Sequence, residues 1–591
     1  MATINVVQTT PFTDQKPGTS GLRKKTKVFL TNKNYLENFV QSIFDALPQS
    51  EIQGSAIVVS GDGRFYNDKA IQVITKMAAA NGISKIIVGT DGLLATPAMS
   101  AVIRERNVYG GIILTASHNP GGPNDDFGIK YNVTNGGPAP SNITNAIFEK
   151  SKSITNYKIC AGMEDIDISK KASYEFDVEG GQKFYVEVID PVEEYLKLLK
   201  TVFNFDLIRK LIQRSDFNFV FDALNGIAGP YATRIFGEEL GVDQANLLNC
   251  VPKPDFGGLH PDPNLTYAAN LVKLMGLKRD GTVLSESEEV KFDLGAAADG
   301  DADRNMILGK RFFVTPSDSV AIIAAKGESC IPYFKDGICT VARSMPTSRA
   351  IDYVAAKKGI KVYEVPTGWK YFGNLMDATK FGKDSLNPLI CGEESFGTGA
   401  SHIREKDGPW AVLCWLSILA SENETREIGS FKSVEDITKE HWKSFGRCYY
   451  CRYDYETVES KAALDMYDNM REIIKQFNSE SGISSSNNIE FGNFKLSAAN
   501  EFSYTDPIDG SVNDKQGLRF IFEDGSRIIF RLSGTGSVGA TIRLYLEKYE
   551  PGDSDNLFRT TQTAMKPLVE VALSISKLET FTGRTEPTVI T

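Results

Sequence analysis

The sequence predicts an α/β fold in which three similar α/β domains with mixed, mostly parallel sheets precede a C-terminal α+β domain. Short apolar strands alternate with amphipathic helical segments over roughly the first 430 residues, and several strands run into loops rich in Gly, Ser, Thr or Asp. From residue 517 the strands instead follow one another directly, with an Asp-Gly turn between the first two. Alternating strands and helices imply right-handed crossovers, which make neighbouring strands parallel.

The length of 591 residues exceeds what one hydrophobic core supports and, at roughly 100–200 residues per domain, suggests three to five domains. We place the α/β domains at 1–190, 191–325 and 326–430, and the α+β domain at 431–591. Each of the four then carries at least one polar loop that could bind a ligand, and these loops are considered in turn below.

The first domain shows the α/β pattern most clearly. Asn34 is expected to cap an amphipathic helix, with Glu37 closing a capping box. Strands are predicted at residues 56–60, 85–88 and 111–114. The third strand leads into Thr115-Ala-Ser-His-Asn-Pro120, so Ser117 should lie just beyond the carboxyl end of a strand, where open α/β sheets bind ligands.

The same pattern of an apolar strand followed by a polar loop recurs in the second and third domains. Further strands are predicted at residues 217–221, 292–298, 338–342, 360–364 and 389–391. They lead to the loops Asp299–Arg304, Pro366–Lys370 and Gly392–Gly397. The last domain differs: a hairpin of 517–523 and 526–533 precedes a strand at 540–547 and a helix from about 555 to 578.

Composition excludes several classes of protein. The balance of 65 basic against 75 acidic residues gives a net charge of −10, which disfavours binding to nucleic acid. The longest apolar run, 409–420, is too short to span a membrane and is expected to be a buried helix. Residues 1–11 lack the features of a signal peptide, so we expect a cytoplasmic protein without a transmembrane segment.

The eight cysteines do not form a recognisable metal or disulfide pattern. Cys448 and Cys451 make the one CxxC sequence, and no second pair or nearby histidine completes a zinc site. We interpret them as two residues of a strand in a reduced protein.

Ser117 is the first candidate for chemistry. A serine in such a loop is commonly a helix cap or a turn residue, and its hydroxyl is a weak nucleophile unless a base or metal activates it. Arg23, Lys130 and the acidic loop Asp299–Arg304 favour the catalytic interpretation, because they could supply charge near the hydroxyl.

The acidic loop places carboxylates at Asp299, Asp301 and Asp303, a spacing that suits Mg²⁺. An EF-hand begins with the same spacing but needs glycine and glutamate where this chain has Arg304 and Lys310. A solvated acidic turn remains the alternative.

The third element pairs Glu393 and Ser395 of one loop with Lys406 of another. The two adjacent carboxylates of the first loop, beside a serine, can accept hydrogen bonds from vicinal sugar hydroxyls, and Lys406 can meet a phosphate or act as an acid. A surface turn would look similar.

The fourth loop matches the dinucleotide motif GxGxxG at Gly534, Gly536 and Gly539. That motif needs a helix after it, and the alternating residues 541–546 predict a strand, so we reject a nucleotide site. The loop instead offers groups for one phosphate dianion: backbone amides and the side chains of Arg531, Ser533, Thr535, Ser537 and Arg543.

Together these loops resemble the α-D-phosphohexomutase superfamily, and most closely its phosphoglucomutase branch. The resemblance runs from Lys16 to Thr591 and is most specific at Thr115-Ala-Ser-His-Asn-Pro120 and Gly392-Glu-Glu-Ser-Phe-Gly397. It implies four domains around a deep central cleft and a phosphoserine at Ser117. The chain departs from this branch at one position of the acidic loop Asp299–Arg304, called the metal loop below. Ala302 stands there in place of a glycine, which would cost about 1 kcal/mol if a positive φ is needed.

The resemblance also implies the activity: interconversion of glucose 1-phosphate and glucose 6-phosphate through glucose 1,6-bisphosphate, which also acts as activator. One Mg²⁺ per chain would be held by the Ser117 phosphate with Asp299, Asp301 and Asp303. The expected catalytic residues are Ser117, His118, Lys130, Arg23 and Lys406, and whether His118, Lys130 or Lys406 is the general base stays open. The expected substrate-binding residues are Thr19, Ser20, Arg304, Thr367, Gly368, Trp369, Glu393, Ser395, Arg531, Ser533, Gly534, Thr535, Ser537 and Arg543.

Two alternatives remain at this point. One is a related mutase that acts on a mannose or pentose phosphate or makes a bisphosphate. The other is a scaffold phosphoprotein of the same family. In each enzymatic case the partners are small hexose or pentose phosphates, and we expect a monomer or a weak dimer.

Overall fold

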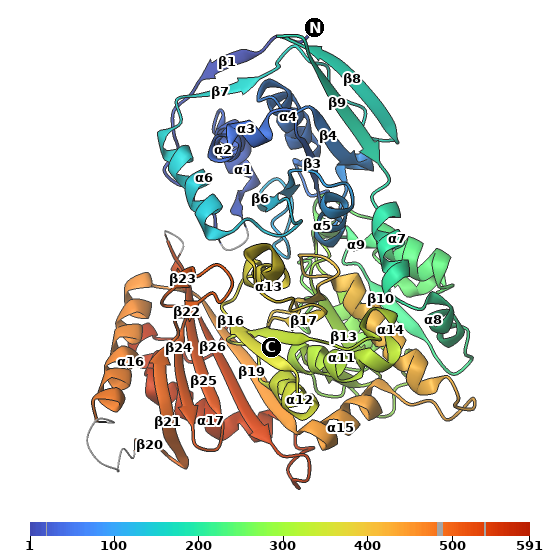
Figure 1. The fold of residues 1–591 in the computed structure, drawn as a ribbon. Helices are drawn as coiled ribbons and strands as arrows, with labels where there is room; N and C mark the ends of the chain where they lie inside the picture. Colours follow the sequence, from blue (N-terminus) through green and yellow to red (C-terminus); the bar gives the residue numbers. More distant parts are fainter. Residues whose placement is uncertain (19–20, 481–488, 537–538, 591) are drawn as a thin grey trace.

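The computed structural model describes residues 1–18, 21–480, 489–536 and 539–590, with the side chains of 480 and 534–536 outside that description. The N-terminal α/β domain (blue to cyan) lies opposite the C-terminal domain (orange to red), and the green and yellow segments lie beside both (Figure 1). We number the four sheet-based units I to IV in chain order.

Domain I contains a seven-stranded sheet in the order β2-β6-β5-β3-β4-β9-β8, in which β5, β3, β4 and β9 are parallel. Its strands are β2 (Leu22–Lys25), β3 (Ala56–Gly61), β4 (Lys85–Gly89), β5 (Gly110–Leu114), β6 (Asp126–Val133), β8 (Ala172–Val178) and β9 (Gln182–Ile189). A separate ribbon pairs β1 (Asn5–Gln8) with β7 (Asn156–Ile159). The mixed, mostly parallel core of this sheet is the one that the alternating pattern predicts.

Helices cover both faces of that sheet because successive strand residues point to opposite sides. Ile57 and Ile112 pack in one core cluster with α2 (Tyr35–Ala46) and α4 (Asn67–Ala80). Val58 and Ile113 pack in another with α5 (Thr96–Glu105). The remaining helices of this part are α1 (Thr26–Thr31), α3 (Gln49–Ile52) and α6 (Ser141–Ser153).

The capping box expected at Asn34 is wrong. Asn34 precedes α2 but has a left-handed backbone, with φ of 67°, and its side chain makes no capping hydrogen bond. Its side-chain amide instead makes hydrogen bonds with the hydroxyls of Thr9 and Tyr157. Because these partners outside the helix occupy its polar atoms, the side chain does not cap the helix.

Domains II and III each hold a smaller sheet with a parallel centre. Domain II has the order β11-β10-β12-β13-β14 and domain III the order β16-β15-β17-β18. The strands are β10 (Phe219–Asp222), β11 (Leu247–Leu248), β12 (Leu294–Ala298), β13 (Asn305–Gly309), β14 (Phe312–Val314), β15 (Thr340–Ser344), β16 (Lys361–Val365), β17 (Leu389–Gly392) and β18 (Thr398–Ala400).

The helices of these two domains include one that is almost wholly buried. The apolar run 409–420 lies in α14 (Gly408–Asn423), which packs against α11 and confirms the expected buried helix. The other helices are α7 (Glu193–Val202), α8 (Phe205–Ile212), α9 (Ala228–Ala232), α10 (Ala269–Leu274), α11 (Pro316–Cys330), α12 (Ala350–Lys358), α13 (Trp369–Met376) and α15 (Val434–Phe445). None of the helices in the described ranges is long and apolar enough to cross a membrane.

Domain IV is a seven-stranded sheet in the order β20-β21-β24-β25-β26-β19-β27, whose pairs are antiparallel. Its strands are β19 (Arg447–Val458), β20 (Glu490–Phe491), β21 (Phe494–Glu501), β24 (Leu518–Phe522), β25 (Arg527–Gly536), β26 (Gly539–Glu550) and β27 (Val589–Ile590), beside a small pair of β22 (Tyr504–Thr505) and β23 (Val512–Asn513). The expected hairpin at Asp524-Gly525 is confirmed, and Gly525 has a positive φ of 82°. Cys448 and Cys451 are free thiols within β19, as expected.

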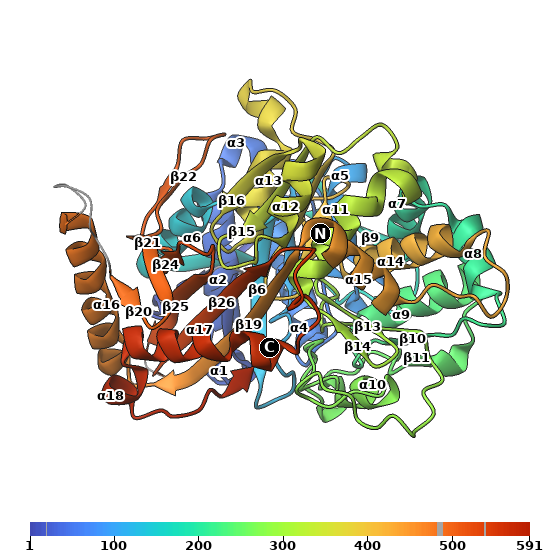
Figure 2. The same cartoon turned by 90° about the horizontal axis from the view of Figure 1, so that it is seen from below.

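Helices α16 (Ser460–Glu480), α17 (Thr561–Ser576) and α18 (Leu578–Thr582) lie on one side of the domain IV sheet (Figure 2). Residues of all three pack into its core cluster or against it. The opposite face, with Ile529 and Tyr545, packs against α13 of domain III. Domain IV is therefore anchored to domain III by one face of its sheet.

Candidate active site

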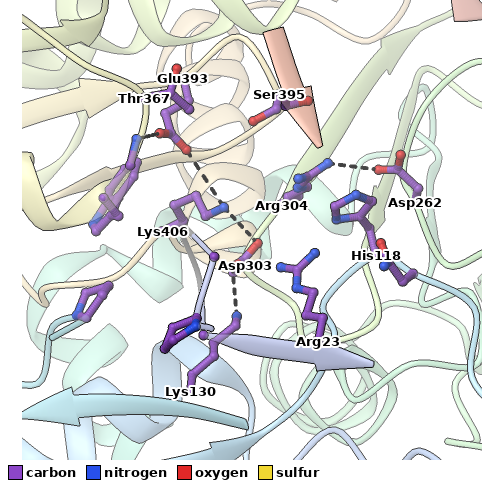
Figure 3. A pocket seen from close by; sticks show the side chains of 18 of the residues that line it. Arg23, His118, Lys130, Asp262, Asp303, Arg304, Thr367, Glu393, Ser395 and Lys406 are labelled. Carbon is purple, nitrogen blue, oxygen red and sulfur yellow. Dashed lines mark hydrogen bonds and ion pairs between the residues drawn. The ribbon is translucent and has the colours of Figure 1, made fainter. Parts of the chain in front are cut away.

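One cavity of about 710 Å³ gathers residues from all four domains. His118 comes from domain I, Arg304 from domain II, Glu393 from domain III and Arg531 from domain IV. Figure 3 shows how the side chains from the first three of these domains point toward one another. Loops that are separated by hundreds of residues thus form one cleft.

Ser117 lies beyond the end of β5, as expected, in a left-handed backbone conformation with φ of 56°. Its amide donates a hydrogen bond to the Thr115 hydroxyl at 2.7 Å. Its own hydroxyl donates to Oδ2 of Asp299 at 2.9 Å. The strained backbone therefore aims the hydroxyl at the acidic loop of domain II.

A buried ion pair that our sequence analysis missed fixes this loop. The Arg64 guanidinium donates to both carboxylate oxygens of Asp62 and to the carbonyl oxygen of Ser117, the latter at 2.8 Å. The Thr115 hydroxyl donates to the same Asp62 carboxylate at 2.6 Å. The signal was present, because Asp62-Gly-Arg64 follows the predicted strand at 56–60 as another polar loop at a strand end.

Asp299, Asp301 and Asp303 form a buried triad whose ligand oxygens lie within 4.8 Å of one another. Oδ1 of Asp301 and Oδ1 of Asp303 are buried without a hydrogen-bond partner, although a Lys406 ammonium lies 3.3 Å from the latter. Hard oxygen atoms that are buried, close together and unsatisfied fit a divalent cation. These residues therefore suit the metal that the spacing predicted.

The metal loop does require a positive φ at Ala302, the conformation that alanine adopts less readily than glycine. Ala302 has a positive φ of 64° and is fully buried. The backbone amide of the neighbouring Arg304 donates to Oδ1 of Asp299 at 2.9 Å. The loop thus keeps its tight turn at the cost of about 1 kcal/mol that alanine is expected to add.

The charges of the triad depend on each other. Burial raises the pKa of the Asp299 carboxyl well above its ordinary value, and the nearby Asp303 and Asp301 raise it further. Burial has the same effect on Asp301, but there Lys130, Thr96 and Lys406 together outweigh it and lower the pKa. A cation among the three carboxylates would favour their ionised forms.

Two lysines reach the triad from different domains. The Lys130 ammonium is 2.8 Å from Oδ2 of Asp301, and the Lys406 ammonium lies between Asp303, at 3.3 Å, and Glu393, at 3.8 Å. Figure 3 shows both lysines converging on Asp303. Each is placed to exchange a proton or to contact a phosphate in the cleft.

His118 and Arg23 line the same part of the cavity. Burial lowers the pKa of His118 well below its ordinary value, and the cations Arg304 and Arg23 lower it further. His118 is therefore held neutral, with its Nδ1 buried and without a hydrogen-bond partner.

The loops of domain III form the wall expected to contact sugar. Oε1 of Glu393 accepts a hydrogen bond from the Gly368 amide at 2.8 Å. Thr367, Trp369 and Ser395 line the cavity beside it. Oγ1 of Thr367 and Nε1 of Trp369 are buried without partners, so this wall holds donors that a polar ligand could satisfy.

The loop of domain IV supplies another part of the lining. Arg531 and Ser533 on β25 and Arg543 on β26 line the cavity. The strand β26 begins at Gly539, so a strand and not a helix continues from the glycine motif, as predicted. Thr19, Ser20 and Ser537 lie outside the described residues, and for Gly534 and Thr535 only the backbone, in β25, is described.

Two further contacts were missed because nothing in their sequence marks them. The Thr96 hydroxyl, at the start of α5, donates to Oδ2 of Asp301 at 2.8 Å. The Asp262 carboxylate lies 3.4 Å from Nη1 of Arg304 (Figure 3). Both orient groups of the metal loop from outside it.

Models of known families match the four parts of the chain in order. Three describe phosphoglucomutase/phosphomannomutase alpha/beta/alpha domains I, II and III and match residues 14–158, 193–311 and 316–445. The fourth, the phosphoglucomutase-1 C-terminal domain, matches residues 447–588. The chain belongs to the phosphoglucomutase/phosphomannomutase family.

Relatives in this family are similar over the full length. A cytoplasmic phosphoglucomutase of Mesembryanthemum crystallinum is 57% identical, and a probable cytoplasmic phosphoglucomutase 2 of Arabidopsis thaliana is 56% identical, with 99–100% of each chain covered. The open form of the Paramecium exocytosis-sensitive phosphoprotein pp63/parafusin, a phosphoglucomutase, matches with 48% identity and a TM-score of 0.88 over both whole chains. The resemblance and the predicted fold class are thereby confirmed.

Proposed function

We propose that this protein is a phosphoglucomutase, an isomerase that interconverts glucose 1-phosphate and glucose 6-phosphate in the cytoplasm. The observation that carries this proposal is the hydrogen bond from the Ser117 hydroxyl to Asp299, which joins a nucleophile to a carboxylate triad beside a cleft rich in cations. The full-length identity to proteins named cytoplasmic phosphoglucomutase supports glucose over mannose and catalysis over a purely structural role.

In the proposed reaction Ser117 carries a phosphoryl group. A hydroxyl of the sugar phosphate attacks phosphorus, the bond from phosphorus to Oγ of Ser117 breaks, and the proton of the hydroxyl passes to a base in the cleft. The product is glucose 1,6-bisphosphate, which turns end for end and returns its other phosphoryl group to Ser117. A trace of this bisphosphate would therefore activate enzyme that has lost its phosphate.

Asp299, Asp301 and Asp303 would hold one Mg²⁺ together with the Ser117 phosphate, and the ion would offset the charge of the transferring group. Positively charged side chains of the protein would offset the charge of the transferring phosphoryl group as well. Arg23 and Arg304 would stabilise the transferring phosphoryl group; both line the cleft, as does His118, which supports this role. His118, Lys130 and Lys406 are the candidates for the base.

The remaining residues bind the rest of the substrate. The hydroxyl groups of the sugar ring would form hydrogen bonds with Glu393 and Ser395, beside Thr367, Gly368 and Trp369. Arg531, Ser533 and Arg543 would hold the phosphate that is not being transferred, together with Gly534, Thr535 and Ser537, while Thr19 and Ser20 would complete the domain I side. Small hexose phosphates are then the partners, and we expect a monomer or weak dimer.

A coupled assay that measures glucose 6-phosphate formed from glucose 1-phosphate tests the proposal. Turnover should require Mg²⁺ and a trace of glucose 1,6-bisphosphate. Turnover of mannose 1-phosphate or a pentose phosphate at equal efficiency would instead assign a related mutase, and no turnover of any sugar phosphate would favour a scaffold role.

A further inference from the structure

The two neighbouring carboxylates of the Gly392–Gly397 loop have different partners. Glu393 contacts Gly368 and Lys406 within the cleft. Glu394 contacts Ser344 at the end of β15 and two side chains of domain IV. Both glutamates line the cavity, but their carboxylates are held by different partners.

Both oxygens of Glu394 already have partners. Oε2 accepts a hydrogen bond from the Ser344 hydroxyl at 2.6 Å, and Oε1 accepts one from the Tyr545 hydroxyl at 3.5 Å. The Glu394 side chain is only 3% exposed. Its carboxylate is thus fixed at the contact between domains III and IV, with little freedom to follow a sugar hydroxyl.

The group that this carboxylate faces is Arg531. Nη1 of Arg531 lies 3.7 Å from Oε1 of Glu394 and 3.4 Å from the Tyr545 hydroxyl, to which it donates. The separation from Glu394 exceeds a direct hydrogen bond, so the charge attracts the guanidinium while, among the described residues, most of its five N–H donors stay available. Arg531 also lines the cleft.

We propose that Glu394, through Tyr545, is a positioning residue that holds Arg531 ready for the phosphate that is not being transferred. This inference rests on the proposed function, in which Arg531 binds that phosphate. Fixing a free arginine side chain costs rotamer entropy, and a preorganised side chain has lost that freedom before the ligand arrives. Domain III thereby sets the affinity of a phosphate site that belongs to domain IV.

A double-mutant cycle on the full-length enzyme tests the inference. Glu394→Gln removes the charge and keeps the shape, and it should lower kcat/KM for glucose 1-phosphate at least about fivefold, mainly through KM. In an Arg531→Met background the same change should alter kcat/KM by less than about twofold, because the side chain on which it acts is gone.

Two controls make the result specific. Tyr545→Phe removes the hydroxyl between the two groups and should show the same dependence on Arg531, which also serves if Glu394→Gln folds poorly. Glu424→Gln changes an exposed glutamate of domain III and should leave kcat/KM unchanged.

The outcomes separate the inference from the proposed function. Equal fold losses with and without Arg531 would overturn the inference and make Glu394 an independent ligand or a structural residue. A rise in kcat/KM for Glu394→Gln would also overturn it, since the carboxylate would then be restraining Arg531. Arg531→Met with an unchanged KM would contradict the proposed phosphate site itself.

Discussion

The Ser117 hydroxyl and the Asp299 carboxylate are joined by a 2.9 Å hydrogen bond although 182 residues separate them in the chain. Domain I and domain II meet at this point, where the Thr96 amide also donates to the Asp301 carbonyl oxygen at 3.0 Å. The nucleophile and the carboxylates that would hold the metal are therefore positioned by one domain contact. Changes on either side of it should alter both stability and turnover.

Arg64→Met should lower the free energy of unfolding by about 3–5 kcal/mol, because it leaves the Asp62 carboxylate buried without its cation. It should also lower turnover, since Arg64 holds the Ser117 carbonyl oxygen. Denaturant unfolding followed by circular dichroism measures the first effect. Arg559→Met, at an exposed arginine, is the control. A stability equal to that of the control would show that the buried pair does not support the loop.

Asp303→Asn should reduce Mg²⁺ binding and lower kcat at least about tenfold while raising KM less, because the ion acts mainly on the transition state. Equilibrium dialysis measures the bound metal and the coupled assay the kinetics. Asp384→Asn, on an exposed aspartate, should change neither. Full activity of the unchanged enzyme in excess chelator would refute a metal requirement.

Glu393 should make the enzyme prefer glucose 1-phosphate over mannose 1-phosphate by at least about tenfold in kcat/KM, which corresponds to about 1.4 kcal/mol. When a sugar hydroxyl points away from the buried Glu393 carboxylate, the hydrogen bond is lost and the cost of desolvating the carboxylate is no longer offset. Glu393→Gln should reduce the preference. Equal kcat/KM values for the two sugars in the unchanged enzyme would overturn the assignment to glucose.

His441 should make the protein less stable in acid. Burial lowers the pKa of this α15 histidine to about 3, and its Nδ1 has no hydrogen-bond partner. Below the ordinary histidine pKa of about 6.5 the unfolded chain binds a proton that the fold excludes, so the stabilisation present above pH 6.5 is lost as the pH falls toward 3, by up to about 1.4 kcal/mol per pH unit.

Thermal melting between pH 7 and pH 4 measures this dependence. His441→Gln cannot take up the proton, so its melting temperature should fall less over that range than the melting temperature of the unchanged protein. Parallel curves for the two proteins would show that His441 is not the group responsible.

The sequence was sufficient for much of the fold because its periodicity is regular. The strand before Ser117 and the strand after Gly539 follow from alternation and from short apolar runs, and both are observed. The cap at Asn34 failed because tertiary contacts to Thr9 and Tyr157 occupy its side chain, and no local pattern reveals them.

Site residues could be predicted from the sequence only where their spacing is typical of a known kind of site. The triad of Asp299, Asp301 and Asp303 follows from its spacing, and the structure gathers it. The different partners of Glu393 and Glu394 could not be predicted, because a loop has no period that assigns side chains to faces. Thr96 was missed for another reason: a threonine at a helix start usually has a purely structural role.

The most direct test of the central claim is to follow a labelled phosphoryl group. The enzyme is phosphorylated with ³²P, peptide mass spectrometry locates the phosphate, and unlabelled glucose 6-phosphate is then added. The account predicts phosphate on Ser117, transfer of the label to glucose 1,6-bisphosphate and to both glucose monophosphates, and no labelling of a folded Ser117→Ala variant. Label that stays on the protein, or phosphate on another residue of an active Ser117→Ala enzyme, would contradict it.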